Sequence, residues 1–199
     1  MASPATGLGP VREPRRGGAA AIVIAGGRGT RMGGIDKPGL ELGGVTLRER
    51  AIQAATNAGL APVVHVGAET GDGPAAALAA GLEQVANDEV VVLAGDLIRP
   101  DLVIEALGVA AAEVGAPAGR DGLVLVDPDG REQWLAARYR VRALREAIAA
   151  LPDGPRGTSL RAITRGLDLA RVPVDTTVVA DIDTWQDYEA ARASLDERA

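Results

Sequence analysis

Residues 21–40, AIVIAGGRGTRMGGIDKPGL, constrain the fold of this chain more than any other stretch. The apolar run Ala20–Ala25 has the length and β-branched content of a buried strand. Five glycines follow within nine residues, Gly26–Gly34. Cations lie in or just past that segment, at Arg28, Arg31 and Lys37. Glycines let the backbone N–H groups approach an anion, and nearby cations neutralise it, so the stretch predicts a phosphate site.

Two familiar glycine motifs do not fit. A P-loop requires Ser or Thr after its lysine, but Pro38 follows Lys37. A dinucleotide fingerprint that started at Gly27 would require glycine at the position of Met32. Pro38 disfavours helix at Lys37, so we expect an extended loop that carries the lysine over a bound triphosphate. The alternative is a glycine-rich turn with solvated cations.

Composition limits the function classes. The 199 residues suit one domain, which we place at residues 19–199 after a disordered leader at residues 1–18. The net charge of −6 argues against nucleic acid and membrane surfaces as partners. The absence of cysteine and the single histidine exclude thiol nucleophiles and His-cluster metal sites. No apolar run approaches the length of a membrane span, so a cytoplasmic location is the default.

Strand and helix patterns alternate along the chain. The strands predicted after Ala20–Ala25 are residues 62–66, 89–94, 122–126, 133–138, 169–172 and 177–182. Helices are predicted from Thr46, Pro74, Pro100, residue 141, Thr158 and Thr184. The pattern predicts an α/β fold, a three-layer αβα sandwich with a mostly parallel, Rossmann-like sheet. Ligands of such sheets bind beyond the carboxyl ends of the strands.

Asp96 ends the third strand, in the run VVVLAGD. This position places a carboxylate at the same rim as the glycine loop, where it can hold Mg²⁺ beside bound phosphates. The alternative is that Asp96 caps a turn or the next helix.

The motifs AGGRGTRMGGIDKP and LAGD resemble those of nucleotidyltransferases, most closely the molybdenum cofactor guanylyltransferase (MobA-like) family. The resemblance covers most of residues 20–195 and implies the fold of nucleotide-diphospho-sugar transferases. It implies catalytic roles for Lys37, Arg31 and Asp96, with Asp96 as a ligand of Mg²⁺. The nucleotide-binding residues that it implies are Ala25, Gly26, Gly27, Gly29, Thr30, Arg31, Lys37, Gly73 and Pro74.

The segment that faces the nucleobase departs from the family pattern. Gly73-Pro74 resembles the start of the family's G-P-L-A-G element, although it is also a common helix start. Only residues 67–72 precede it, where the family has a longer stretch with an acidic residue that reads guanine. Glu69 and Asp72 are the candidates for that role, and the sequence does not choose between them.

Three further segments resemble the acceptor site of the family. The residues concerned are Gln133, Trp134, Arg156, Ser159, Asp181 and Asp183. The alternatives are a core aromatic for Trp134, a helix cap for the segment of Arg156 and Ser159, and acids at a helix N-terminus for the two aspartates. Alternation at a strand end points Asp181 and Asp183 to the same side.

The resemblance implies transfer of GMP from GTP to the phosphate of molybdopterin or its metal-loaded form, with release of pyrophosphate. It also implies transient contact with proteins that make or receive the cofactor. The alternatives are a CTP-dependent molybdopterin cytidylyltransferase, another sugar or small-molecule phosphate nucleotidyltransferase, and a degenerate homologue that binds nucleotide without turnover. The short segment 67–72 favours the last of these.

Overall fold

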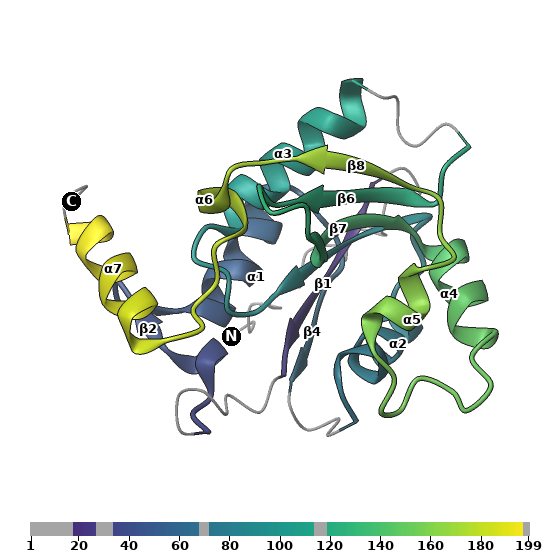
Figure 1. The fold of residues 1–199 in the computed structure, drawn as a ribbon, viewed down its shortest axis with the longest axis horizontal. Helices are drawn as coiled ribbons and strands as arrows, with labels where there is room; N and C mark the ends of the chain where they lie inside the picture. The colour runs from purple at the N-terminus through teal and green to yellow at the C-terminus, as the bar shows by residue number, and fades with distance from the viewer. Residues whose placement is uncertain (1–17, 27–33, 68–71, 114–118, 197–199) are drawn as a thin grey trace, which may run out of the picture.

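A six-stranded sheet forms the centre of the molecule (Figure 1). The strands are β1 (Ala20–Ala25), β4 (Val63–Gly67), β5 (Glu89–Ala94), β6 (Gly122–Val126), β7 (Glu132–Arg140) and β8 (Leu169–Pro173). Their order is β4-β1-β5-β7-β6-β8. Five strands run in one direction, because β7 alone is antiparallel to its neighbours β5 and β6. The expected α/β fold with a mostly parallel sheet is confirmed.

This computed structural model describes residues 18–26, 34–67, 72–113 and 119–196. Apart from Gly18, the predicted leader lies outside these residues, and so does most of the glycine-rich loop.

Helices cover both faces of the sheet (Figure 1). One face carries α1 (Leu47–Asn57) and α3 (Pro100–Glu113). The opposite face carries α2 (Pro74–Glu83), α4 (Val141–Ala149) and α5 (Leu160–Thr164). Along β1, Ile22 and Ile24 enter one core and Val23 enters the other. This alternation explains why the whole strand is apolar, since both of its faces are buried.

Smaller elements lie beside the sheet. A 3₁₀ helix, η2 (Lys37–Gly39), leads into a hairpin of β2 (Glu41–Leu42) and β3 (Val45–Thr46). Short α6 (Thr176–Val179) and the final helix α7 (Trp185–Asp196) follow β8. Tyr188 and Ala191 of α7 pack with Leu42 and Leu47 in a separate apolar cluster.

Local signals fixed several boundaries correctly. Thr46 caps α1, because its hydroxyl accepts from Glu49 N at 3.1 Å and the Glu49 carboxylate accepts from Thr46 N at 3.0 Å. Pro74 opens α2, where its missing N–H group costs no helix hydrogen bond.

Two expectations about local structure were wrong. Lys37 lies in η2, not in an extended loop: Leu40 N donates to Lys37 O at 3.0 Å. A proline is tolerated at the start of a short 3₁₀ helix. Pro38 is therefore compatible with η2 and does not prevent it. Residues 177–182 form no regular strand; α6 occupies residues 176–179, and only Asp181 makes an isolated bridge, with Leu97.

An irregularity in β7 shapes the rim of the sheet. Val124 pairs with Ala137, but the next residue of β6, Leu125, pairs with Gln133. Residues 134–136 are therefore extra on β7, and such bulges redirect side chains near functional sites. The buried Tyr139 hydroxyl donates to Trp134 O at 2.9 Å and ties the bulge to the strand.

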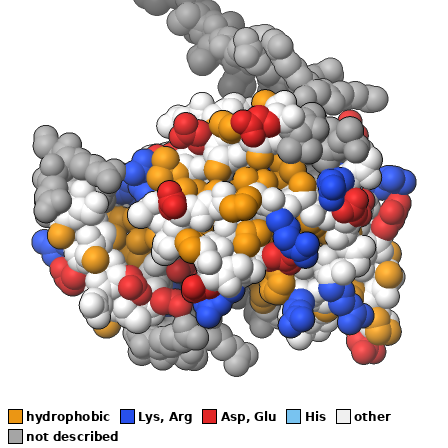
Figure 2. Space-filling view, turned by 45° about the horizontal axis from the view of Figure 1, so that its top comes forward, with side chains coloured by type: hydrophobic (Ala, Val, Ile, Leu, Met, Phe, Trp, Pro, Cys, Tyr) orange, Lys and Arg blue, Asp and Glu red, His pale blue; other side chains and the backbone are white. Residues whose placement is uncertain are grey.

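Charge is unevenly distributed. On the face shown in Figure 2, several basic side chains gather at the lower right and acidic ones at the lower left. The electrostatic field therefore differs between these two regions of the surface, and the net charge of −6 does not describe either one. Within the ranges described, none of the helices has both the length and the apolar character that crossing a membrane requires.

Candidate active site

The carboxyl ends of β1 and β5 leave no room for a side chain at Gly95. Gly95 N donates to Ile24 O at 2.9 Å, just past the end of β5. A Cβ on Gly95 would lie 2.7 Å from the Cβ of Ala25 and 2.9 Å from its Cα, so a side chain there would force the strands apart. Glycine at this position brings Asp96 to the rim beside Gly26, the residue that begins the glycine-rich loop.

Lys37 and Asp96 face the same cavity. Its volume is about 130 Å³, and its lining consists of Ile24, Gly26, Lys37, Pro38, Ala94, Asp96 and Leu135. The predicted proximity of the basic loop and the aspartate is therefore correct for these two residues.

Asp183 joins them from the other end of the chain. Lys37 Nζ donates to Asp183 Oδ1 at 2.7 Å, and the Lys37 side chain is only 12% exposed. The segment that carries Asp183 is held against residues 96–98, because Ile98 N donates to Ala180 O at 3.0 Å and Ile182 N donates to Asp96 O at 3.3 Å. One lysine and several carboxylates therefore meet at the carboxyl ends of β1 and β5.

The crowding of carboxylates perturbs their titration. Burial raises the pKa of Asp96, and the negative charge of Asp183 raises it further, while its own backbone N–H and Lys37 oppose the change. The pKa of Asp181 is raised to about 6, first by burial and then by the charges of Asp96 and Asp183. Asp181 is exposed by surface area because it lines an open cavity, so water moderates this effect. These carboxylates favour a bound cation or proton.

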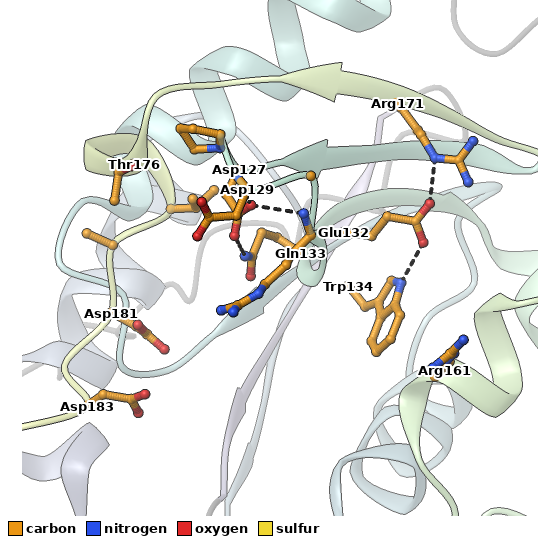
Figure 3. A pocket seen from close by; sticks show the side chains of 15 residues that line it. Asp127, Asp129, Glu132, Gln133, Trp134, Arg161, Arg171, Thr176, Asp181 and Asp183 are labelled. Carbon is orange, nitrogen blue, oxygen red and sulfur yellow. Dashed lines mark hydrogen bonds and ion pairs between the residues drawn. The ribbon is translucent and has the colours of Figure 1, made fainter.

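A second, larger cavity adjoins the aspartates. It measures about 890 Å³, and its lining includes four predicted acceptor residues, Gln133, Trp134, Asp181 and Asp183. Figure 3 shows Asp181 and Asp183 at one end of the cavity and Trp134 with two arginines at the other. Trp134 is half-buried and packs partly against the core, so it combines the core role with a place in the cavity wall.

The polar turn before β7 orients Gln133. Asp127 Oδ1 accepts from Asp129 N at 3.0 Å and from Arg131 N at 2.9 Å, which closes the turn. Asp127 Oδ2 accepts from Gln133 Nε2 at 2.9 Å (Figure 3). The hydrogen bond from Arg131 N, with those from Gln133 and Asp129, lowers the pKa of Asp127, so the charged form holds this arrangement.

The other two predicted acceptor residues lie outside the lining of this cavity. Arg156 has a side chain that is 82% exposed, and its Nε lies 3.3 Å from Asp72 Oδ2. Ser159 caps α5, with its hydroxyl oxygen accepting from Ala162 N at 3.3 Å, as the alternative reading predicted. In this structure both residues support the loop before α5.

Gly73 and Pro74 lie at the start of α2, after β4 at the same edge of the sheet. Gly73 has φ of 88°, a conformation that favours glycine. Asp72, one candidate for reading the base, contacts Arg156, and its carbonyl accepts from Gly157 N at 2.9 Å. Glu69 lies outside the described residues, as do four predicted nucleotide-binding residues, Gly27, Gly29, Thr30 and Arg31.

Comparison with known protein families decides which family of proteins has this arrangement at the rim of the sheet. Residues 21–172 match the family model of the MobA-like NTP transferase domain. The chain belongs to this family. A molybdenum cofactor guanylyltransferase from Cupriavidus taiwanensis is 30% identical over 198 residues, covering 86% of this chain and 95% of the relative.

Solved structures share the fold of this MobA-like chain. Molybdopterin-guanine dinucleotide biosynthesis protein A from Archaeoglobus fulgidus superposes with a TM-score of 0.67 at 23% identity, covering 89% of this chain and 99% of that one. A 2-C-methyl-D-erythritol 4-phosphate cytidylyltransferase from Thermus thermophilus gives a TM-score of 0.62 at 20% identity, covering 90% and 99%. At these identities the likeness extends to the fold alone.

The sequence reading gave no site role to six charged residues in the wall of the large cavity of this MobA-like domain. They are Asp127, Asp129, Arg131, Glu132, Arg161 and Arg171. Glu132 directly precedes the predicted pair Gln133 and Trp134, which was a signal for that residue. Arg161 comes from α5 and Arg171 from β8, and only the strand order brings β8 to this side of β7.

Proposed function

We propose that this protein transfers GMP from GTP to the terminal phosphate of molybdopterin or its metal-loaded form and releases pyrophosphate. One observation carries the proposal: Lys37 and Asp96 line a single cavity at the carboxyl ends of β1 and β5. The guanylyltransferase relative, alike over most of both chains, supports the choice of GTP and acceptor.

The reaction needs no nucleophile from the protein. An oxygen of the acceptor phosphate attacks the α-phosphorus of GTP, a new P–O bond forms, and the bond to the β-phosphate oxygen breaks as pyrophosphate leaves. Catalysis of this kind depends on positioning and on charge stabilisation. In the proposal, the triphosphate lies along the glycine-rich loop and Lys37 offsets the charge that develops on it.

The cavities suit a phosphate donor and a separate acceptor. The smaller one, about 130 Å³, contains the reactive groups, and the larger one, about 890 Å³, begins at Asp181 and Asp183. An acceptor in the large cavity would present its phosphate towards Lys37, since Asp183 both lines that cavity and bonds to Lys37. Trp134 and Gln133 then provide a ring face and a hydrogen-bonding amide for the body of the acceptor.

A magnesium ion fits the donor set in this proposal. Among the residues described, no group of three or more Asp, Glu, His or Cys side chains is arranged to hold a metal ion by itself. Mg²⁺ is commonly held by one or two carboxylates together with substrate phosphates, so Asp96 with a bound triphosphate is sufficient. Held by Asp96, such an ion would offset the negative charge of the phosphates.

Nucleotide preference and turnover test the proposal. Thermal unfolding would be measured with GTP, CTP, ATP or UTP, each with and without Mg²⁺. At about 100 times its Kd, GTP with Mg²⁺ should stabilise the fold by about 2.7 kcal/mol, and the other nucleotides less. Pyrophosphate release should then require both GTP and molybdopterin.

Each other result would select a different function. Stabilisation by CTP alone would replace the guanylyl assignment with a cytidylyl one. Binding of GTP with no pyrophosphate release in the presence of molybdopterin would favour a nucleotide-binding protein without turnover.

A further inference from the structure

Asp127, the residue that follows β6, determines which end of the Gln133 amide faces the large cavity. Asp127 Oδ1 already accepts from two backbone N–H groups, Asp129 N at 3.0 Å and Arg131 N at 2.9 Å. Asp127 Oδ2 accepts from Gln133 Nε2 at 2.9 Å (Figure 3). These hydrogen bonds, first of all that from Arg131 N, hold the pKa of Asp127 below its usual range, so the group is ionised at neutral pH. An ionised carboxylate has no proton to donate, so the nitrogen end of the amide must face it.

The oxygen end of this amide is therefore turned away from Asp127 (Figure 3). Gln133 is half-buried in the wall of the large cavity. Within the ranges that the structure describes, Gln133 Oε1 accepts no hydrogen bond, either from the guanidinium of Arg131 or from another residue. This oxygen is thus a hydrogen-bond acceptor of fixed direction that is available to a ligand in the cavity.

Trp134, the next residue of β7, lines the same cavity and has no free donor. Its Nε1 donates to Glu132 Oε2 at 3.1 Å, and Glu132 Oε1 accepts from Arg171 Nε at 2.7 Å. The single N–H group of the indole is therefore occupied, and Trp134 offers a ligand only its ring. A ligand oxygen placed at Gln133 Oε1 would find no compensating donor on Trp134.

We propose that Asp127 is a positioning residue: it fixes Gln133 Oε1 as a hydrogen-bond acceptor, to which the ring of the acceptor substrate donates an N–H group. The inference rests on the proposed function, since it describes the same substrate. A ring with an oxygen at this point would set two hydrogen-bond acceptors against each other, and the amide cannot turn because Asp127 holds its nitrogen end. The substrate class is a phosphate ester whose flat ring carries lactam or amino N–H groups, as a pterin does.

Two flat probes of the same shape test this inference without nucleotide. The probes are 2-quinolinone and coumarin, neutral bicyclic rings that differ at one position, where the lactam has N–H and the lactone has oxygen. The protein should bind 2-quinolinone about five- to tenfold more tightly than coumarin, as expected for one hydrogen bond made or missing. NMR titration of the probe signals gives both Kd values.

Asp127→Asn separates the orientation of the amide from the charge of the cavity. The introduced amide can keep its oxygen on the two backbone N–H groups, and it then turns an N–H group towards Gln133. The Gln133 amide should reverse in response, so the preference for 2-quinolinone should be lost. Gln133→Leu removes the oxygen without altering the turn and should also abolish the preference.

Asp129→Asn is the matched control. It removes the same charge from the wall of the same cavity, but the Asp129 carboxylate makes no hydrogen bond with the residues described. This variant should keep the preference for 2-quinolinone. Circular dichroism would check that each variant is folded.

The outcomes separate this inference from the proposed function. Equal binding of the two probes, binding of neither, tighter binding of coumarin, or a preference that survives in Asp127→Asn would overturn the role of Asp127, even if GTP is turned over. The expected pattern in a protein that releases no pyrophosphate would support the role of Asp127 and overturn the nucleotidyl transfer.

Discussion

Lys37 provides a largely buried cation in the small cavity. Its side chain is 12% exposed and bonds to Asp183 at 2.7 Å. In the proposed reaction it offsets charge on the triphosphate, so Lys37→Ala should lower turnover on the order of 10²–10³-fold. Steady-state pyrophosphate release measures this loss.

A nearby cation serves as the control for Lys37. Arg48 lies 3.6 Å from Asp36, with 32% of its side chain exposed, and it does not line the small cavity. Arg48→Ala should retain turnover. Unchanged turnover in Lys37→Ala, with the fold intact by circular dichroism, would remove Lys37 from the mechanism.

Glu132 should titrate visibly through Trp134. Its pKa lies below the ordinary value of 4.5, so its two hydrogen bonds are fully present above that value and are lost as the pH falls through the lower, folded-state pKa. In a Trp185→Phe protein, acidification should change Trp134 emission with a midpoint below pH 4.5. A midpoint above that value would contradict the arrangement.

Glu132→Gln is the matched control for this titration. The amide has no charge to lose, so the acid transition of Trp134 should disappear. The substitution should cost only about 1 kcal/mol of unfolding free energy or less, because Arg171 is 72% exposed and water screens the pair. Urea unfolding at neutral pH measures that cost.

At the residue scale, sequence located Lys37 and Asp96 better than their partners. Lys37 and Asp96 were predicted to share a rim because parallel strands end at the same edge of a sheet. The bond between Lys37 and Asp183 joins residues 146 positions apart. Arg161 and Arg171 carry no local signal, since only the folded arrangement of α5 and β8 brings both to the wall of the large cavity.

Helix packing against the sheet can be tested with two helical glycines. A Cβ on Gly81 of α2 would lie 2.8 Å from Cγ2 of Ile22, a fully buried residue of strand β1. Gly81→Ala should therefore cost about 1–3 kcal/mol through overpacking. Urea unfolding monitored by circular dichroism gives the value.

Gly108 of α3 is the matched control, because a side chain at this position would have free space. A Cβ there would meet nothing within 4 Å, and the residue is exposed. Gly108→Ala should stabilise the protein by about 0.4–1 kcal/mol, because alanine loses less backbone entropy on folding. If both variants shifted stability in the same direction, the packing of α2 on β1 would need revision.

At the scale of elements, the sequence determined most boundaries because their signals are local. Apolar runs defined the strands, and Thr46 and Pro74 marked helix starts correctly. The prediction for Lys37 failed because a 3₁₀ turn satisfies the constraint of Pro38 as well as an extended loop does. The reversal of β7 and its extra residues 134–136 depend on long-range pairing, which periodicity does not encode.

At the scale of the whole molecule, the clustered carboxylates of the site should lower the free energy of unfolding when no cation is bound. Asp181, Asp96 and Asp183 repel one another, and the chain holds them close through the contact of residues 96–98 with residues 180–182. Such strain at a functional site is maintained by the stability of the rest of the fold. It should appear as a pH dependence of unfolding.

The direction of that dependence follows from Asp181. Its folded-state pKa is about 6 and its ordinary value is 3.8, so between these values the folded protein binds more protons than the unfolded chain. The contribution of Asp181 to stability therefore falls as the pH rises from 3.8 to about 6 and is constant above that. An asparagine at this position carries no charge, so Asp181→Asn does not lose stability over this pH range. It should be more stable than the parent at neutral pH.

Thermal unfolding in EDTA, followed across this range, measures the difference. The advantage of Asp181→Asn should grow up to about pH 6 and remain at about 1 kcal/mol or less, since solvent screens the exposed carboxyl. Asp153→Asn, in the exposed loop after α4, removes the same charge elsewhere and should show no such growth. If Asp181→Asn were less stable than the parent at pH 7, the three carboxylates would not repel one another in the metal-free protein, and the attraction of this rim for a cation would lose its basis.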